Sequence, residues 1–296
     1  MNVIDEIKKY QRENTGLVHA SNILAKNSSR MTTEQKKGFE RITEKYYEYL
    51  KSNLDLKGNS YDDVKVRSAK LNSYYNFFHD NGYDNLFSSQ GKFRSTILEE
   101  FMYLLFKDLV DEINKKHPSK KLYCGSSKAY ANLFFTARNL NDFIESPTIG
   151  INQKDQDFAI YRNLSVTVEN KTFEVKMPIV AIECKTYIDK TMLEGSIATA
   201  EKIKSGNPYA LFFIVTENYD VSLDVDPAYS RIDQVFVLRK CTRKSMDANW
   251  KNVSADVLWP LVAQVKDYFK REWSDVSNRL ISKGMIISHF VNNESV

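Results

Sequence analysis

The chain has 296 residues, of which 42% are hydrophobic and 27% charged, with a formal net charge of +4. These values are ordinary for a globular protein and exclude a chain that is disordered throughout. The mild positive charge permits a nucleic-acid partner but does not require one.

The cysteine pattern and the absence of long apolar segments limit the class of protein further. Three widely spaced cysteines include no Cys-x-x-Cys pair, which argues against structural zinc and indicates a reducing cytoplasm. The N-terminal residues lack the apolar run of a signal peptide. The longest strongly apolar stretch, residues 210–215, is too short to cross a bilayer.

The first ninety residues are predicted to be mainly helical. Thr32 and Gln35 form a capping-box pattern, and apolar residues follow it at helical spacing as far as Leu50. Breaker residues at 57–59 end this helix, and residues 61–78 have the pattern of another one.

The clearest helical pattern covers residues 92–115, where apolar side chains trace one wide face. Glu100 falls on or beside that face. An unpaired buried carboxylate lowers the stability of the folded protein, so a glutamate at this position requires an explanation. Glu99 is the alternative acidic residue on the same helix.

From about residue 120 the pattern changes to short strands. Residues 179–185 and 209–216 are apolar strands separated by a helix at 189–204, which is a βαβ-like unit. This order predicts an α/β (α+β) fold, with a mixed sheet flanked by helices. The other elements expected are strands at 133–136, 158–161, 164–168, 171–176 and 232–238, a turn at 169–170 and a final helix at 254–273.

Three polar residues follow or precede apolar strand segments. Glu183 and Lys185 come directly after the apolar run 179–182, and their spacing puts both side chains on one face of the strand. Asp157 precedes the apolar residues 158–160, and Asp155 is its alternative. If the two strands pair, the three side chains converge. A Glu-x-Lys pair on a solvated strand is the competing interpretation.

Two carboxylates and one ammonium suit the hydrolysis of a phosphodiester. Carboxylate oxygens bind Mg²⁺, which stabilises the leaving oxyanion and activates water. The lysine orients or helps to deprotonate the attacking water and offsets charge on the phosphate. Asp157 and Glu183 are therefore expected to hold Mg²⁺, with Glu100 as an added ligand and catalytic residue.

Asp157 and Glu183-x-Lys185 resemble the PD-(D/E)XK nuclease signature, with Gln156 in place of its proline. Residues 91–101, 155–160 and 182–194 resemble the restriction endonucleases of the BbvCI kind, which cut CCTNAGC-like sites with two related but different subunits. The resemblance is strongest over residues 90–240.

The resemblance implies a Mg²⁺-dependent type II restriction endonuclease, or one subunit of a heterodimeric enzyme. Residues 1–90 are expected to be a helical DNA-recognition region and residues 91–296 the nuclease domain. The partners would be double-stranded DNA and a second subunit, either identical or related. Alternatives are a subunit that nicks one strand, a DNA-binding module that depends on a partner, and a non-specific repair or defence nuclease.

Basic residues near the ends of the predicted elements are candidates for contacts with DNA phosphates. Lys92 and Arg94 begin the predicted helix at 92–115, where the helix N-terminus also attracts anions. A solvated surface role is the alternative for each of them. The candidates are Lys92, Arg94, Lys190, Arg239, Lys240 and Arg243, with Lys244 beside the last.

Overall fold

The computed structural model describes residues 2–87, 93–119, 121–168 and 171–271, with residues 277, 280, 281 and 284. The chain divides into two units, residues 1–262 and residues 263–296, and the fold and site below belong to the first. None of the described helices combines the length and apolar character needed to cross a membrane.

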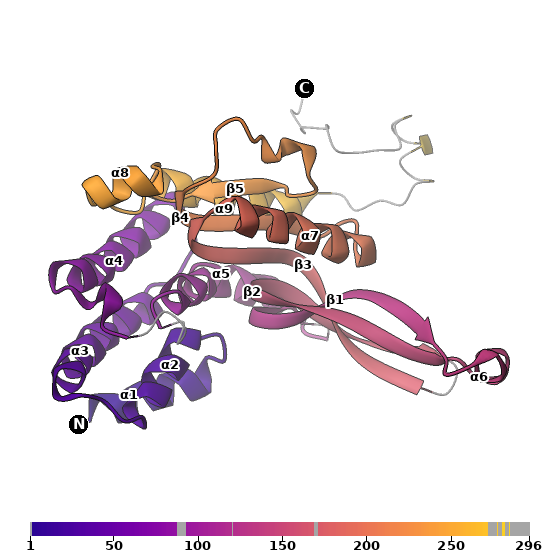
Figure 1. Cartoon of the computed structure of the whole chain (residues 1–296), viewed down its shortest axis with the longest axis horizontal. Helices are drawn as coiled ribbons and strands as arrows, with labels where there is room; N and C mark the ends of the chain where they lie inside the picture. Colours follow the sequence, from indigo (N-terminus) through magenta and orange to yellow (C-terminus); the bar gives the residue numbers. More distant parts are fainter. Residues whose placement is uncertain are drawn as a thin grey trace. The chain divides into compact units, whose positions relative to one another are not determined.

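The N-terminal region is helical, as predicted (Figure 1). The Thr32 hydroxyl accepts a hydrogen bond from the backbone N–H of Gln35, and the Gln35 side chain accepts one from the Thr32 N–H. The predicted capping box is therefore confirmed. Two short helices precede this cap and were not predicted individually. The elements are α1 Val3–Glu13, α2 Val18–Asn27, α3 Thr33–Asp55, α4 Tyr61–Asp80 and the 3₁₀ turn η1 Tyr83–Asn85.

Helix α5, Thr96–Lys116, joins the helical region to the sheet. It contacts α2 and α4 on one side and strands β1, β2 and β3 on the other. The ring of Phe106 stacks on the ring of Phe158 in β2 with centroids 5.6 Å apart. The expected domain limit at residue 90 lies just before α5, among residues 88–92, which are outside the described part.

One mixed sheet of five strands forms the centre of the described unit, in the order β1-β2-β3-β4-β5. The β1–β2 and β2–β3 pairs are antiparallel, whereas the β3–β4 and β4–β5 pairs are parallel. This confirms the predicted mixed sheet. The strands are β1 Tyr123–Thr136, β2 Thr148–Val168, β3 Lys171–Ile188, β4 Leu211–Tyr219 and β5 Gln234–Val237.

Strands β2 and β3 are longer than predicted, since each joins two segments that were expected to be separate strands. The first part of β2 pairs with β1 and the last part pairs with β3, so β2 has a hydrogen-bonded neighbour over its whole length. Asp157 therefore lies inside a strand and does not begin one. The predicted turn at 169–170 is outside the described residues.

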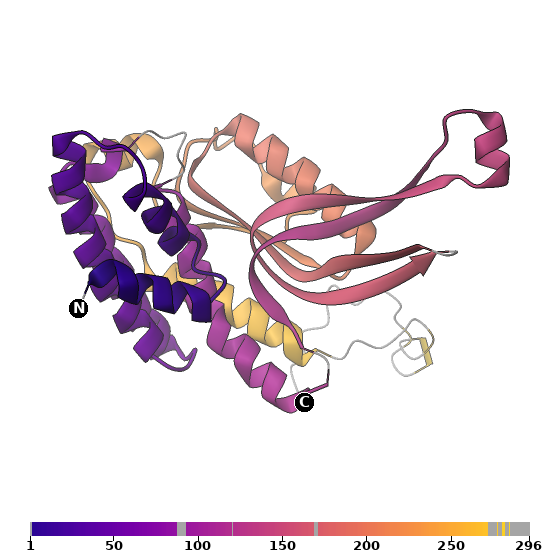
Figure 2. The ribbon, with the colours of Figure 1, turned by 90° about the horizontal axis from the view of Figure 1, so that it is seen from below.

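Beyond the point where β3 pairs with β2, strands β1 and β2 continue as a two-stranded arm (Figures 1 and 2). The short helix α6, Leu140–Glu145, joins the two strands at the tip and has no buried residue. Leu140 and Ile144 on this helix are 70% and 71% exposed. The tip thus presents apolar side chains that no other described residue covers.

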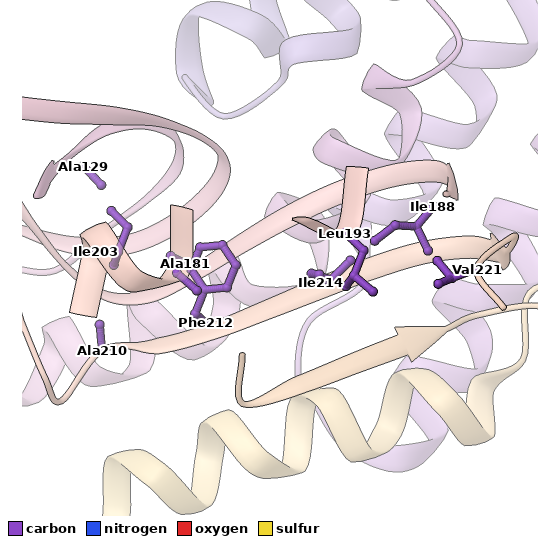
Figure 3. Packing of buried hydrophobic residues seen from close by; sticks show 10 residues of the cluster. Ala129, Ala181, Ile188, Leu193, Ile203, Ala210, Phe212, Ile214 and Val221 are labelled. Carbon is purple, nitrogen blue, oxygen red and sulfur yellow. The ribbon is translucent and has the colours of Figure 1, made fainter. Parts of the chain in front are cut away.

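Helix α7, Lys190–Gly206, connects the parallel strands β3 and β4. The side chain of its N-cap residue, Asp189, accepts a hydrogen bond from the N–H of Met192. Its buried residues Leu193, Ala200 and Ile203 pack in one cluster with side chains of β3 and β4 (Figure 3). The remaining elements are η3 Pro227–Tyr229, α8 Arg243–Ala248 and α9 Ala255–Lys270, of which α9 was predicted.

Helices α5 and α7 cover opposite faces of the sheet. Phe158, which stacks on α5, pairs with Ile182, whereas the adjacent Ala181 belongs to the cluster under α7. Because successive side chains of a strand alternate between faces, the two helices are on different sides.

Candidate active site

Strand pairing brings Asp157 and the Glu183-x-Lys185 pair together on one face of the sheet. The register pairs Phe158 with Ile182, which puts Asp157 across from Glu183. The Lys185 Nζ lies 3.5 Å from Asp157 Oδ2 and 3.4 Å from Glu183 Oε2. The two carboxylates and the ammonium therefore converge, as the spacing of the sequence predicts.

Each carboxylate is held through one of its two oxygens. Asp157 Oδ2 accepts a hydrogen bond of 2.8 Å from the backbone N–H of Cys184. Glu183 Oε2 accepts one of 2.5 Å from the hydroxyl of Ser196 on α7. Among the described residues, none donates a hydrogen bond to Asp157 Oδ1 or Glu183 Oε1. These two oxygens are the ones available to a cation.

The charge of Lys185 follows from its surroundings. Partial burial lowers the pKa of its ammonium group, but the negative charges of Asp157 and Glu183 outweigh this effect, so the pKa is raised. The side chain is therefore an ammonium ion at neutral pH, and it offsets the repulsion between the two carboxylates.

Cys184 lies between the two charged residues of the motif but is buried. Burial, followed by the charges of Asp157 and Glu99, raises the pKa of its thiol well above the usual value. A thiol that stays protonated is a poor nucleophile, so the side chain has a packing role.

The structure corrects the expectation that Glu100 joins this site. Glu100 is fully buried, its Oε2 accepts a hydrogen bond of 2.9 Å from the Ala20 N–H, and its Oε1 accepts one of 2.8 Å from the Tyr46 hydroxyl. Both oxygens thus hold α2 and α3 against α5. Glu99 is the acidic residue nearer the motif, because its charge acts on the Cys184 thiol.

The alternative at the other carboxylate position was Asp155. Asp155 is exposed and pairs in register with Lys128 on the arm formed by β1 and β2. Asp157, two residues further along β2, is the aspartate that contacts Lys185. The structure therefore supports the choice of Asp157 as the partner of Glu183.

Two of the predicted DNA-contact residues have a different role. Arg94 donates hydrogen bonds of 2.8 and 3.0 Å to the two carboxylate oxygens of Glu217 in β4. Arg239, whose side chain is fully buried, also pairs with Glu217 at 2.6 Å. Their guanidinium groups lie 3.9 Å and 5.0 Å from the ring centre of Tyr75. Both arginines neutralise a buried carboxylate, so the expectation that they bind phosphate is corrected.

The other predicted phosphate contacts are at the surface. Lys190 and Lys240 have side chains that are 74% and 57% exposed, each with an acidic neighbour at 3.9 and 3.7 Å. The Arg243 guanidinium lies 4.0 Å from the ring centre of Tyr187, two residues after Lys185 in β3. Lys92 is outside the described residues.

Sequence reasoning missed Ser196, whose hydroxyl contacts the catalytic glutamate candidate. A signal was present, since a polar residue at position 196 interrupts the apolar stripe formed by Leu193, Ala200 and Ile203. The contact itself depends on how α7 packs on β3, which local spacing does not reveal.

A mixed sheet with helices on both faces, carrying an Asp and a Glu-x-Lys pair that converge, defines a nuclease core of the PD-(D/E)XK type. The sequence model of the family described as Bpu10I restriction endonuclease matches residues 90–295, which is more than half of the chain. The chain belongs to this family, which confirms the predicted type II restriction endonuclease acting on DNA.

A search of solved structures found a similar chain in the native BbvCI A2B2 tetramer. The TM-score is 0.54 at 20% sequence identity, and the match covers 88% of this chain and 98% of that chain. At this identity the likeness concerns the fold. A search of curated proteins found no match.

Proposed function

We propose that this restriction endonuclease hydrolyses phosphodiester bonds of double-stranded DNA at a specific site with Mg²⁺, through Asp157, Glu183 and Lys185. The observation that carries the proposal is the convergence of both carboxylates on the Lys185 Nζ, at 3.5 and 3.4 Å. Two carboxylates and one ammonium group at this spacing match the chemistry of phosphodiester hydrolysis, in which negative charge must be neutralised near the reacting phosphate.

The donor set fits Mg²⁺. Asp157 and Glu183 each keep one carboxylate oxygen without a hydrogen bond from the described residues, and Mg²⁺ prefers one or two carboxylates with several waters. Among the described residues, no three or more Asp, Glu, His or Cys side chains form a group that could hold a metal, so the proposed site relies on two carboxylates together with water. When bound, the metal would lower the pKa of a coordinated water and stabilise the leaving oxygen.

Lys185 has an electrostatic role in this proposal. Its ammonium group, with a raised pKa, remains charged near the place where the phosphate would approach. The charge stabilises the negative charge that grows on the phosphoryl oxygens in the transition state. It also orients a water molecule by donating a hydrogen bond to it.

A second subunit completes the enzyme in our proposal, because one site cuts one strand and a double-strand break needs two. The partner is a second copy or a related chain. The similar solved structure is described as an A2B2 tetramer. We also propose that the helical residues 1–90 take part in recognition of the DNA sequence, and that the enzyme acts in the bacterial cytoplasm.

The test is the cleavage of supercoiled plasmid DNA with Mg²⁺, Ca²⁺ or EDTA. The wild type is compared with Glu183→Gln, and with Glu174→Gln as a matched control on an exposed position of the same strand. We expect discrete linear fragments from the wild type and Glu174→Gln with Mg²⁺, and none from Glu183→Gln.

Other products separate the alternatives. Nicked circles that depend on Glu183 indicate a chain that cuts one strand and requires a different partner for the other. A continuous smear indicates a nuclease without sequence specificity. Equal cleavage by the wild type and Glu183→Gln would show that the assigned site is wrong.

A further inference from the structure

Ser196 is a polar residue at a core position of α7. The buried residues of this helix are Leu193, Ser196, Ala200 and Ile203, and the three apolar ones pack in the cluster beneath the helix (Figure 3). Ser196 itself is 1% exposed. A hydroxyl in such surroundings lowers stability unless it forms a hydrogen bond, so its partner indicates why a serine is there.

The hydrogen bond of Ser196 differs from those of other hydroxyl residues on the helix. Thr199 donates to the carbonyl of Gly195 and Ser205 to the carbonyl of Lys202, both within α7. Such local bonds are the common arrangement for Ser and Thr in helices. Ser196 instead donates to Glu183 Oε2 in β3, at 2.5 Å.

The consequence for Glu183 is a defined orientation of its carboxylate. Ser196 Oγ and Lys185 Nζ both approach Oε2, at 2.5 and 3.4 Å. Two donors on one oxygen restrict rotation of the carboxylate about its last bond. The Oε1 atom is then presented as the oxygen for a cation.

We propose that Ser196 is a positioning residue for the metal site, which orients Glu183 so that Oε1 binds the divalent cation. The inference rests on the proposed function of Glu183. Residues that hydrogen-bond to a metal-binding carboxylate commonly change metal affinity or activity by about 10- to 100-fold when removed.

The first experiment is direct binding of Mn²⁺ alone, measured by titration calorimetry, without any cleavage step. We expect Ser196→Ala to bind Mn²⁺ about 10-fold or more weakly than the wild type. Ser196→Thr keeps the hydroxyl and should restore most of the affinity. Ser205→Ala, which removes a hydroxyl from the same helix away from the site, should bind as the wild type does.

The second experiment is the Mg²⁺ dependence of plasmid cleavage. Ser196→Ala should need about 10-fold more Mg²⁺ for half-maximal cleavage, whereas a purely structural role would change the melting temperature and leave the Mg²⁺ requirement unchanged. If Ser196→Ala does not fold, Ser196→Cys provides the same comparison, because it keeps the volume and weakens the donor.

The outcomes distinguish this inference from the proposed function. Wild-type Mn²⁺ affinity in Ser196→Ala, with Glu183→Gln inactive, overturns the role of Ser196 alone. Full activity of Glu183→Gln, or no Mn²⁺ binding by the wild-type protein, overturns both. Weaker binding in Ser196→Ala with rescue by Ser196→Thr supports the inference.

Discussion

Arg94 and Glu217 form a two-point ion pair in the interior, although they are 123 residues apart in the sequence. The pair ties the segment before α5 to the end of β4. Burial raises the pKa of Glu217, but the charges of Arg94 and Arg239 outweigh burial and lower it. The carboxylate is therefore ionised and neutralised in the folded protein.

Glu217→Gln should destabilise the protein strongly. The substitution leaves the buried guanidinium of Arg239 without its counter-charge and leaves Arg94 with only Asp84, and breaking a buried ion pair in this way costs about 3–5 kcal/mol. Denaturant unfolding of the wild type and the variant measures the difference. Glu201→Gln, which removes an exposed pair with Arg231, serves as the control and should cost less than about 1 kcal/mol. Equal effects of both changes would contradict the structural role of the pair.

Lys185→Gln should abolish most DNA cleavage while DNA binding is kept. The ammonium group stabilises charge in the transition state, and the loss of one such group typically costs about 100-fold or more in rate. Single-turnover cleavage measures the rate, and binding in Ca²⁺ measures affinity. Lys176→Gln, on the same strand beside Tyr161, is the matched control. A rate for Lys185→Gln within a few-fold of the wild type would exclude the assigned role.

Glu100 should make the stability depend on pH. Burial raises its pKa from 4.5 to about 7, in spite of the hydrogen bonds from Ala20 and Tyr46. Between pH 4.5 and about 7 the folded state binds more protons than the unfolded state, so the contribution of Glu100 to the free energy of unfolding falls as the pH rises. Over this range the free energy of unfolding falls by about 3 kcal/mol, at about 1.4 kcal/mol per pKa unit.

The measurement is denaturant unfolding at pH 4.5, 6 and 7.5 for the wild type and Glu100→Gln. We expect the variant to gain stability relative to the wild type as the pH rises, because glutamine does not ionise. Glu112→Gln, on the exposed side of α5, should follow the wild type. Parallel curves for the wild type and Glu100→Gln would show that the carboxyl does not titrate in this range.

Arg243→Ala should weaken DNA binding without affecting the folded structure. Its side chain is 46% exposed and lies over Tyr187, close to the end of the strand that carries Lys185. The loss of one phosphate contact lowers the affinity and reduces the slope of log K against log salt by about 1. Fluorescence anisotropy in Ca²⁺ at several salt concentrations measures both, with Lys202→Ala, at an exposed position near the end of α7, as the control. Wild-type affinity at low salt would remove Arg243 from the DNA surface.

Much of the architecture was predictable from local patterns. The capping box at Thr32, the long helix that became α5 and the βαβ-like unit from β3 to β4 are all in the structure. The lengths of β2 and β3 were not predictable, because a strand continues wherever a neighbour satisfies its backbone. Those neighbours, β1 for the first half of β2 and β3 for the second, are identified only by the register.

The amino-acid sequence by itself determined that Glu183 and Lys185 share a face, since alternation along a strand fixes which side chains point the same way. The convergence of Asp157 on this pair depends on the pairing of β2 with β3, which the tertiary structure supplies. Only the tertiary structure decided which other polar residues contact this group. Glu100 turns towards Tyr46, Arg94 and Arg239 pair with Glu217, and Ser196 reaches Glu183. The reason is physical: burial and choice of partner depend on segments far apart in the chain, whose approach no local spacing encodes.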